Sequence, residues 1–455
     1  MFSVSGGTAL GFHLLIKPTG AACNLDCKYC YYLSKESLYP GSDFRMSDEV
    51  LETCIRQLLQ SSPSPEVMIA WQGGEPTLMG LDFFQKSIRH VLKYRQPGQK
   101  VLYSMQTNGT LLDDRWCAFF REHDFLIGLS VDGPRELHDT YRVDKGGHGS
   151  FDRVMRGWQC LKEHRVNVNI LCTVHAANVN HPLEVYRFFR DTMGAQFIQF
   201  IPIVERTTPE LLSLANRGWR EEGTGQRPFY RQQGHLVTSR SVKPKQYGSF
   251  LIAIFDEWVR RDVGRVFVQL FDTSLANWLG GLPGLCEHQE TCGLAPALEH
   301  NGDLYTCDHF VEPDFLLGNI QTVPMIELVR SEKQRRFGLS KRDALPTYCR
   351  QCDVHFACHG GCPRNRFVKT PDGEAGLNYL CAGYKLFFHH VDLPMRIMCN
   401  LLHQGKAPAE VMRILPLEEA WLQTAFARAR PDDPCPCGSG RKFKHCHQRL
   451  VKKKG

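Results

Sequence analysis

The chain has 455 residues, of which 42% are hydrophobic and 23% are charged, and its formal net charge is +7. This length allows a sizeable core with two or three domains, and the composition excludes a disordered or fibrous chain. No apolar run approaches the length of a membrane span, and the first residues, MFSVSGG, lack the basic and apolar regions of a signal peptide. We therefore expect a cytoplasmic protein.

The cysteine content is high, with 19 in the chain. In a protein without an export signal, cysteines at short spacings argue for metal ligands rather than disulfides, because the cytosol keeps thiols reduced. The positive formal charge counts cysteine as neutral. Thiolates bound to iron–sulfur clusters and zinc carry net negative charge and would bring the chain close to neutrality. The charge therefore gives no support for a nucleic-acid partner.

Apolar strand-like runs alternate with amphipathic helical patterns over the first 200 residues or so. The strand-like runs are Phe12–Lys17, Val67–Trp71, Val101–Gln106, Leu126–Val131, Val168–Val174 and Phe197–Ile203. The helical patterns are Ser47–Gln60, which opens with a candidate capping box at Ser47-Asp48-Glu49-Val50, then Leu81–Tyr94, Leu111–His123, Phe151–His164 and Pro182–Met193. Six β/α units predict an α/β fold with a parallel sheet, and they are too few for a closed eight-stranded barrel.

Three cysteines, Cys23, Cys27 and Cys30, follow the first strand at spacings of four and three. A [4Fe–4S] cluster takes four ligands, so three thiolates leave one iron open to a small molecule. A zinc knuckle is the alternative, but it needs a fourth Cys or His close by, and the next histidine is His90. The spacing therefore favours an open iron–sulfur cluster.

This C-x3-C-x2-C run resembles the signature of the radical S-adenosylmethionine (SAM) superfamily. The second strand is followed by Gln72-Gly73-Gly74-Glu75-Pro76, which looks like the motif that holds the SAM methionine amine. Two glycines permit close backbone approach to a ligand, and Glu75 can accept a hydrogen bond from an ammonium group. The resemblance implies an open (β/α)6 partial TIM barrel with its active site at the carboxyl ends of the strands.

The same resemblance implies further contacts with SAM. Ser130 and Arg142 would hold its carboxylate, Tyr29 would lie along the adenine, and Val204 would line the adenine pocket. Each has a simpler alternative, since a serine at a strand end often satisfies only backbone groups. The cofactor-binding residues that we expect are Tyr29, Gly74, Glu75, Ser130, Arg142 and Val204.

The stretch from Arg206 to Lys245 is polar, rich in Arg, Gly and Gln, and shows little periodicity. We interpret it as an insertion over the active site or a connecting segment, although a charged loop is usually only solvated. Helical spacing returns at Tyr247–Val263.

A second group of cysteines begins at residue 286. Eight thiolates can close two four-iron clusters, which suits electron conduction, and two zinc ribbons are the alternative. The spacing, with Gly302 five residues before Cys307, matches the SPASM domain. By that resemblance, Cys286, Cys292, Cys307 and Cys362 would hold the nearer cluster, and Cys349, Cys352, Cys358 and Cys381 the outer one.

The run Cys307-Asp308-His309-Phe310 resembles a motif of anaerobic sulfatase-maturating enzymes, as do Tyr31-Tyr32 and Gln72. The resemblance covers roughly Phe12 to Pro394. It implies three [4Fe–4S] clusters, SAM, and oxidation of a Cys or Ser in an unfolded sulfatase segment to Cα-formylglycine. A flavodoxin- or ferredoxin-type reductant would supply electrons.

Roles for individual residues follow from this resemblance. A radical derived from SAM would take a Cβ hydrogen, and Asp308 would accept the thiol or hydroxyl proton. The reason for choosing Asp308 is that a base near the auxiliary clusters couples loss of this proton to loss of the second electron through those clusters. Tyr32 and Gln72 would contact the substrate. For Asp308 the alternative is a carboxylate that only solvates a strand end.

Two other functions remain open at this point. The same clusters could serve a maturase that modifies a ribosomally made peptide, and a short precursor-peptide gene nearby would favour that function over a sulfatase gene. A non-catalytic iron–sulfur adaptor is the other alternative. An adaptor has no need of a SAM pocket, so the motifs after the strands argue against it.

The C-terminal residues Cys435, Cys437, Cys446 and His447, in the pattern C-x-C-x8-C-H, have the composition of a closed structural zinc site. The segment looks like the SEC-C motif at the tail of the bacterial translocation motor. So small a fold needs its metal, here Zn2+, because it has almost no core. Its basic residues suggest docking to a partner such as translocon or ribosome components; a disordered basic tail is the alternative.

Five segments follow from these patterns. They are a radical SAM core at 1–245, a connecting helical segment at 246–285, a SPASM domain at 286–400, a helical linker at 401–430 and a zinc-binding tail at 431–455. The other cysteines, which lie in helix or strand patterns and are expected to be small core residues, are Cys54, Cys117, Cys160, Cys172 and Cys399.

Overall fold

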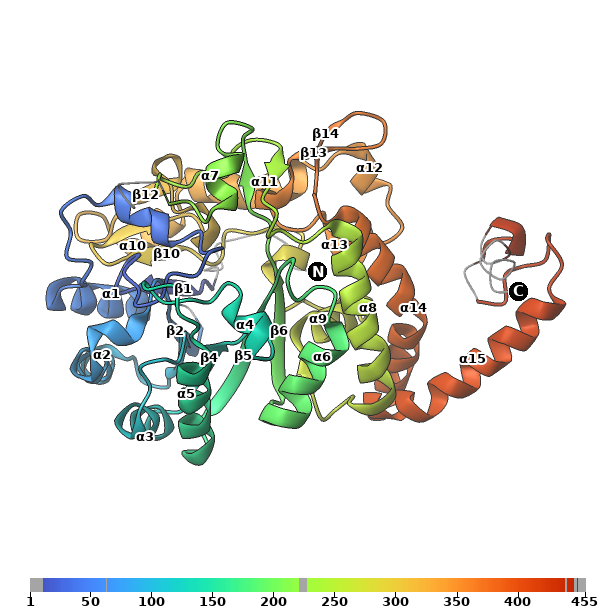
Figure 1. Cartoon of the computed structure of the whole chain (residues 1–455), viewed down its shortest axis with the longest axis horizontal. Helices are drawn as coiled ribbons and strands as arrows, with labels where there is room; N and C mark the ends of the chain where they lie inside the picture. The colour runs from blue at the N-terminus through green and yellow to red at the C-terminus, as the bar shows by residue number, and fades with distance from the viewer. Residues whose placement is uncertain (1–10, 63, 221–226, 438–439, 446–447, 449–455) are drawn as a thin grey trace.

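The computed structural model describes residues 11–62, 64–220, 227–437, 440–445 and 448. Its centre is a ten-stranded sheet in the order β12-β11-β10-β1-β2-β3-β4-β5-β6-β9 (Figure 1). Strands β1 to β6 pair in parallel along their length. They are β1 Leu14–Lys17, β2 Glu66–Trp71, β3 Lys100–Thr107, β4 Phe125–Ser130, β5 Asn167–Val174 and β6 Phe197–Pro202. All six predicted strands are confirmed, with ends that differ by no more than two residues.

The predicted helices between these strands are also present. They are α1 Asp48–Ser61, α2 Leu81–Tyr94, α3 Asp114–Glu122, α5 Phe151–Glu163 and α6 Pro182–Arg187, with a short α4 Arg135–Asp139 and a π turn, Phe188–Met193, that continues α6. The Ser47 hydroxyl accepts a hydrogen bond from Val50 N at 3.2 Å, so the predicted cap exists. The reciprocal half of a capping box is absent, because the third helical position is Val50, which has no polar group to bond back.

The second half of the chain extends the same sheet. Strand β10 (Ala297–Glu299) pairs in parallel with β1, and the register sets Lys17 beside Glu299. Strands β11 (Asp303–Tyr305) and β12 (Leu316–Asn319) add antiparallel neighbours, while β9 (Phe267–Val268) pairs with β6 at the other edge. The sequence segments predicted as barrel core and SPASM domain therefore share one sheet and one hydrophobic core.

Two long helices join the halves behind the sheet. Helix α8 (Pro244–Arg261) covers the predicted helix at 247–263, and it packs on α14 (Cys381–His403). Glycines at the crossing let the backbones touch. A Cβ at Gly383 would lie 2.1 Å from Pro244 O, and one at Gly248 would lie 2.6 Å from Gly383 O.

The remaining elements are short, apart from two helices. They are α7 Leu212–Asn216, α9 Gln269–Trp278, α10 Met325–Val329, α11 Glu332–Asp343, α12 Thr347–Arg350, α13 His355–Cys358, α15 Val411–Arg428, and the two-stranded pairs β7 Arg206–Thr207 with β8 Leu236–Val237 and β13 Val368–Lys369 with β14 Ala375–Leu377. No helix among the described residues is long and apolar enough to cross a membrane.

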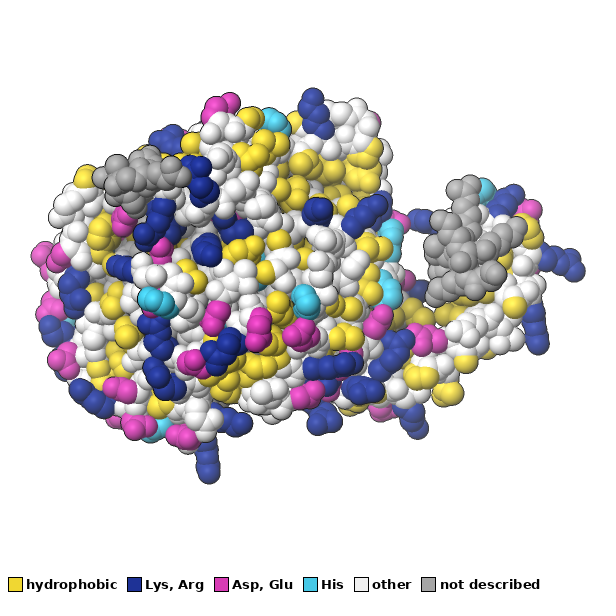
Figure 2. All heavy atoms as spheres, in the orientation of Figure 1, with side chains coloured by type: hydrophobic (Ala, Val, Ile, Leu, Met, Phe, Trp, Pro, Cys, Tyr) yellow, Lys and Arg dark blue, Asp and Glu magenta, His cyan; other side chains and the backbone are white. Residues whose placement is uncertain are grey.

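Helix α15 leads away from the body to the C-terminal segment (Figure 1). It is tied to the body by an ion pair from Arg260 to Glu419 at 2.6 Å. The ring of Phe426 stacks on Phe443 of the tail, with centroids 5.8 Å apart. Figure 2 shows acidic and basic side chains interspersed over the visible face of the body, with Lys and Arg side chains projecting from the tail end.

The glycine crossing predicts a specific loss of stability. Gly383→Ala places a methyl group against the Pro244 carbonyl and must separate α14 from α8, at a cost of about 1–3 kcal/mol for overpacking. The thermal midpoint of the anaerobic protein should fall. Gly284→Ala is the matched control, because a Cβ there meets nothing within 4 Å. Equal midpoints for both variants would show that the helices do not depend on this contact.

Candidate active site

The cysteine loop follows β1 directly and is held against the motif after β2. Gly74 N donates to Gly20 O at 2.8 Å, and Glu75 N donates to Ala22 O at 2.9 Å. A Cβ at Gly74 would lie 1.9 Å from Ala22 O. Gly74 thus approaches the backbone of the cysteine loop closely and sets the position of the loop, and its predicted contact with SAM stays a prediction.

Glu75 is fully buried and already carries four donors. Its Oε1 accepts from Thr77 N at 3.1 Å, from Thr77 Oγ1 at 2.6 Å and from Thr107 Oγ1 at 2.7 Å, and its Oε2 accepts from Asn108 N at 2.7 Å. Burial raises the pKa of this carboxyl in spite of these bonds. Glu75 thus joins the ends of β2 and β3, and its contact with the SAM amine stays a prediction.

Asp132, just beyond β4, is a buried carboxylate that the sequence analysis did not single out. Its Oδ1 accepts from Thr173 N at 2.9 Å, and its Oδ2 lies 2.9 Å from Arg142 Nε and accepts from the Tyr29 hydroxyl. Burial alone would raise the pKa of Asp132, but Arg142 and His175 hold it well below its usual range. The only available signal was an acid directly after an apolar strand.

The predicted SAM contacts gather around this carboxylate to different degrees. Arg142 directs its Nε toward Asp132, and its terminal nitrogen donates to Thr173 Oγ1 at 3.3 Å. Tyr29 is 8% exposed and packs on His175, with ring centroids 5.8 Å apart. Ser130 ends β4 and is half-buried, whereas Val204 belongs to the apolar core beyond β6. The structure therefore joins Tyr29 and Arg142 through Asp132, and their contacts with SAM remain predictions.

The three loop thiols fit an iron–sulfur cluster by their chemistry. Burial raises the pKa of Cys27 to about 12 and that of Cys23 further, with added repulsion from the neighbouring thiols. Deprotonating three buried thiols side by side is costly without a cation, and bound iron would remove that cost. An all-sulfur donor set is the set that iron–sulfur clusters use.

A second carboxylate, the half-buried Asp308, contacts the cysteine loop at Tyr31. It begins a short 3-10 turn, Asp308–Phe310, and its Oδ2 accepts from the Tyr31 hydroxyl at 2.9 Å. Its Oδ1 forms an ion pair with Lys17, which is 1% exposed. Burial raises the pKa of Asp308, but Lys17, His309 and the Tyr31 hydroxyl outweigh burial and leave the pKa below its ordinary value. These contacts favour the ionised form of Asp308, which is the form that can accept a proton.

Lys17 is a second residue of this site, besides Asp132, that the sequence patterns did not indicate. Its Nζ donates to Gln72 Oε1 at 2.7 Å and lies 4.3 Å from the centre of the Tyr32 ring. The available signal was a lysine at the end of an otherwise apolar strand. Tyr32 is 3% exposed, and its hydroxyl donates a hydrogen bond to Glu299. The predicted substrate residues Tyr32 and Gln72 thus pack around Lys17, and their contact with substrate stays a prediction.

The polar segment after β6 reaches over this region. Gln232 Nε2 donates to His309 O at 2.5 Å, and Tyr230 N donates to Ser34 Oγ at 3.2 Å. Arg227 forms an ion pair with Asp26 of the cysteine loop. These contacts agree with the interpretation of the segment as an insertion over the active site.

The later cysteines fall into two groups. In the first group, burial raises the pKa of each thiol, and electrostatic repulsion from Cys362 raises it further; these thiols are Cys286, Cys292 and Cys307. In the second group, electrostatic repulsion from Cys349 and Cys352 raises the pKa values of Cys358 and Cys381. The structure therefore brings the thiols together in the two sets expected from the resemblance, with Cys362 reaching back to the earlier cysteines.

Two of the four predicted zinc ligands in the tail are described. Cys435 is buried and Cys437 is half-buried, and Cys435 N donates to Arg441 O at 2.8 Å. Cys446 and His447 lie outside the described residues.

Family models match three parts of the chain. The radical SAM superfamily matches residues 18–189, an iron–sulfur cluster-binding domain (SPASM) matches residues 292–353, and the SEC-C motif matches residues 433–449. These matches agree with the three cysteine-bearing regions described above.

Relatives extend over nearly the whole chain. A serine-type anaerobic sulfatase-maturating enzyme of Bacteroides thetaiotaomicron is 46% identical over 409 residues, which are 89% of this chain and 95% of the relative. A cysteine-type enzyme of Clostridium perfringens is 36% identical over 380 residues, 83% of this chain and 95% of the relative. The solved structure of native anSMEcpe with bound AdoMet (SAM) has a TM-score of 0.72 and 34% identity, and the match covers 85% of this chain and 99% of that one. This chain therefore belongs to the anaerobic sulfatase-maturating enzymes of the radical SAM superfamily.

Proposed function

We propose that this chain oxidises a Cys or Ser side chain in an unfolded segment of a sulfatase to Cα-formylglycine. The observation that carries the proposal is the position of Asp308, which Lys17 and Tyr31 hold beside the cysteine loop. The relatives named as sulfatase-maturating enzymes support the substrate class over a ribosomally made peptide. A solved relative with 34% identity holds both AdoMet and a peptide, which supports a polypeptide substrate.

The cofactors that we propose are SAM and three [4Fe–4S] clusters. Cys23, Cys27 and Cys30 would leave one iron open for SAM. The two groups of later thiols would each close a cluster, the nearer one with Cys307 and Cys362, the outer one with Cys381. The separation of these thiols into two mutually repelling groups supports this assignment.

The reaction removes a hydrogen atom from Cβ, a proton from the thiol or hydroxyl group, and one electron. Cys23, Cys27 and Cys30 would hold the cluster that binds SAM, and this group would supply the 5′-deoxyadenosyl radical needed to remove one Cβ hydrogen. Asp308 accepts the thiol or hydroxyl proton. The remaining electron leaves toward Cys307, which adjoins Asp308 in the chain. Serine yields the aldehyde directly, whereas cysteine yields a thioaldehyde, and water hydrolyses it to the aldehyde with release of hydrogen sulfide.

Neighbouring side chains, of which Lys17 is buried, would hold Asp308 in place for this step. The Lys17 ammonium keeps the carboxylate ionised in a site that would otherwise favour its neutral form. Tyr31 donates to Oδ2, and Gln72 holds the Lys17 ammonium. These contacts fix the direction of the carboxylate before a substrate arrives, which avoids reorganisation at the moment of proton transfer.

Further parts of the proposal concern partners. The tail would bind one Zn2+ through Cys435, Cys437, Cys446 and His447, and the match to the SEC-C motif supports this. Exposed basic residues on the tail suit docking to a translocon or ribosome component. A flavodoxin- or ferredoxin-type protein would supply electrons in the cytoplasm, where the thiol-rich sites stay reduced.

The role of Asp308 predicts an uncoupled reaction in one variant. Asp308→Asn keeps the shape but cannot accept the proton, so formylglycine formation should fall by roughly 10²–10⁴-fold. Cleavage of SAM to 5′-deoxyadenosine should persist, because it occurs at the other cluster. Mass spectrometry of peptide and nucleoside measures both products.

The exposed Asp314 provides the control for this variant. Asp314→Asn should leave both products unchanged. Equal loss of formylglycine and 5′-deoxyadenosine in Asp308→Asn would mean that Asp308 supports its cluster or positions the substrate, and an unchanged formylglycine yield would remove it from the mechanism.

The cluster assignment predicts the iron content of the anaerobic protein. Three cubanes give about twelve iron atoms per chain, and changing Cys23, Cys27 and Cys30 together to Ala should leave about eight and abolish SAM cleavage. Cys399→Ala, a buried thiol outside these groups, should keep the full iron content. Zinc in place of iron at the later cysteines would overturn the electron path.

A further inference from the structure

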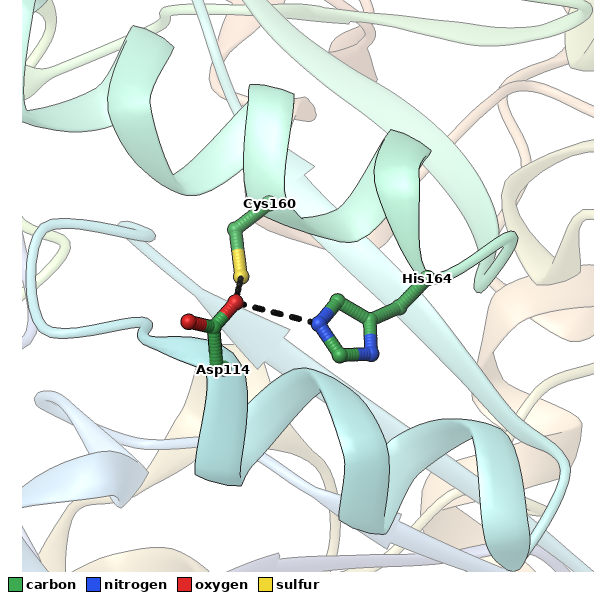
Figure 3. A group of neighbouring side chains, drawn as sticks. All are labelled: Asp114, Cys160 and His164. Carbon is green, nitrogen blue, oxygen red and sulfur yellow. Dashed lines mark hydrogen bonds and ion pairs between the residues drawn. The ribbon is translucent and has the colours of Figure 1, made fainter.

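A group of metal-ligating side chains lies on the outer helices, apart from the carboxylates and thiols of the active site. Asp114 begins α3, and Cys160 and His164 lie four residues apart at the end of α5 (Figure 3). Residues at this spacing share one face of a helix. Cys160 packs against the hydrophobic core, as expected, but it is only half-buried and its sulfur lies 3.6 Å from Asp114 Oδ1.

Local geometry turns these side chains toward one another. Asp113, not Asp114, caps α3, since its side chain accepts from Trp116 N at 3.0 Å. The Asp114 carboxylate is therefore available to α5. Gly157 lets α5 approach closely, because a Cβ there would lie 2.2 Å from Gly109 O. One helical turn later, Cys160 reaches Asp114.

The distances suit a single small cation. Asp114 Oδ1 lies 3.1 Å from His164 Nε2 and 3.6 Å from Cys160 Sγ, and the three ligand atoms all lie within 4.8 Å of one another. Tetrahedral Zn2+ with ordinary bond lengths separates its ligand atoms by about 3.3–3.7 Å. The two distances from Asp114 Oδ1 are thus close to this range, and the third, between Cys160 Sγ and His164 Nε2, is at most 4.8 Å.

The ligand types select the metal. One sulfur, one imidazole nitrogen and one carboxylate oxygen form a mixed set that suits Zn2+, whereas Ca2+ and Mg2+ prefer oxygen ligands alone. Behind this set lies the fully buried Cys117 of α3.

A comparison within the chain argues against an ordinary surface ion pair. Asp144 and His148 also form an exposed carboxylate–imidazole pair, at 3.4 Å, and Arg153 is the third partner of that carboxylate. An arginine there opposes a cation. At Asp114 the third partner is a thiol instead. The two pairs therefore differ in the one group that decides whether a metal can bind.

We propose that Asp114, Cys160 and His164 bind a Zn2+ ion that clamps α3 to α5, with water in the fourth position. This zinc is separate from the one proposed for the C-terminal tail and from the iron–sulfur clusters. It would link two successive β/α units on the outer surface of the barrel.

The test is the zinc content of the full-length, cluster-loaded protein after incubation with zinc chloride and desalting into metal-free buffer. The unaltered chain should retain one zinc more than Cys160→Ser, His164→Gln or Asp114→Asn. His148→Ala, which alters the matched pair, should retain as much as the unaltered chain. Iron content and 5′-deoxyadenosine formation should be equal in all five proteins, which shows that each is folded.

A second measurement follows the clamp itself. Added zinc should raise the thermal midpoint of the unaltered chain and of His148→Ala, but not that of Cys160→Ser. Equal zinc content in all variants would overturn the proposal. So would zinc that is lost on desalting, which would mark adventitious binding only.

Discussion

The parallel pairing of β1 with β10 is the constraint on which the active site depends. It sets the last residues of two strands, Lys17 and Glu299, side by side, although they lie far apart in the chain. A lysine buried to 1% exposure needs a counter-charge, since an unpaired ammonium in such a place costs several kcal/mol. Asp308 provides that charge from the segment just after β11. The sheet thereby brings a carboxylate of the second half to the cysteine loop of the first.

The cysteine loop is hydrogen-bonded to two carboxylates, the buried Asp132 and the half-buried Asp308. The Tyr29 hydroxyl donates a hydrogen bond to Asp132 on one side, and the Tyr31 hydroxyl donates one to Asp308 on the other. Cys30 lies between these two tyrosines. One carboxylate is balanced by Arg142 and the other by Lys17. The loop that would carry the open iron is therefore fixed from both flanks, by Asp132 and by Asp308.

Sequence patterns predicted the barrel well and the residue contacts less well. Apolar runs between amphipathic helices located β1 to β6 closely, because burial on both faces makes such strands nearly continuous in hydrophobic residues. Strand β10 has only three residues, too few for a recognisable period, and its parallel partner is hundreds of residues away. For the same reason the pairing of Lys17 with Asp308 could not be predicted. Glu75 and Arg142 were found by motif, but their protein partners lie on other strands, which spacing does not reveal.

The most direct test of this account is a double-mutant cycle on formylglycine formation with Lys17→Met and Asp308→Asn. If the two side chains act as one proton-accepting unit, the double variant should lose no more activity than the more damaged single variant, within about 0.5 kcal/mol. Independent losses that multiply in the double variant would contradict the account, because Lys17 would then act on the reaction by a route that does not pass through Asp308.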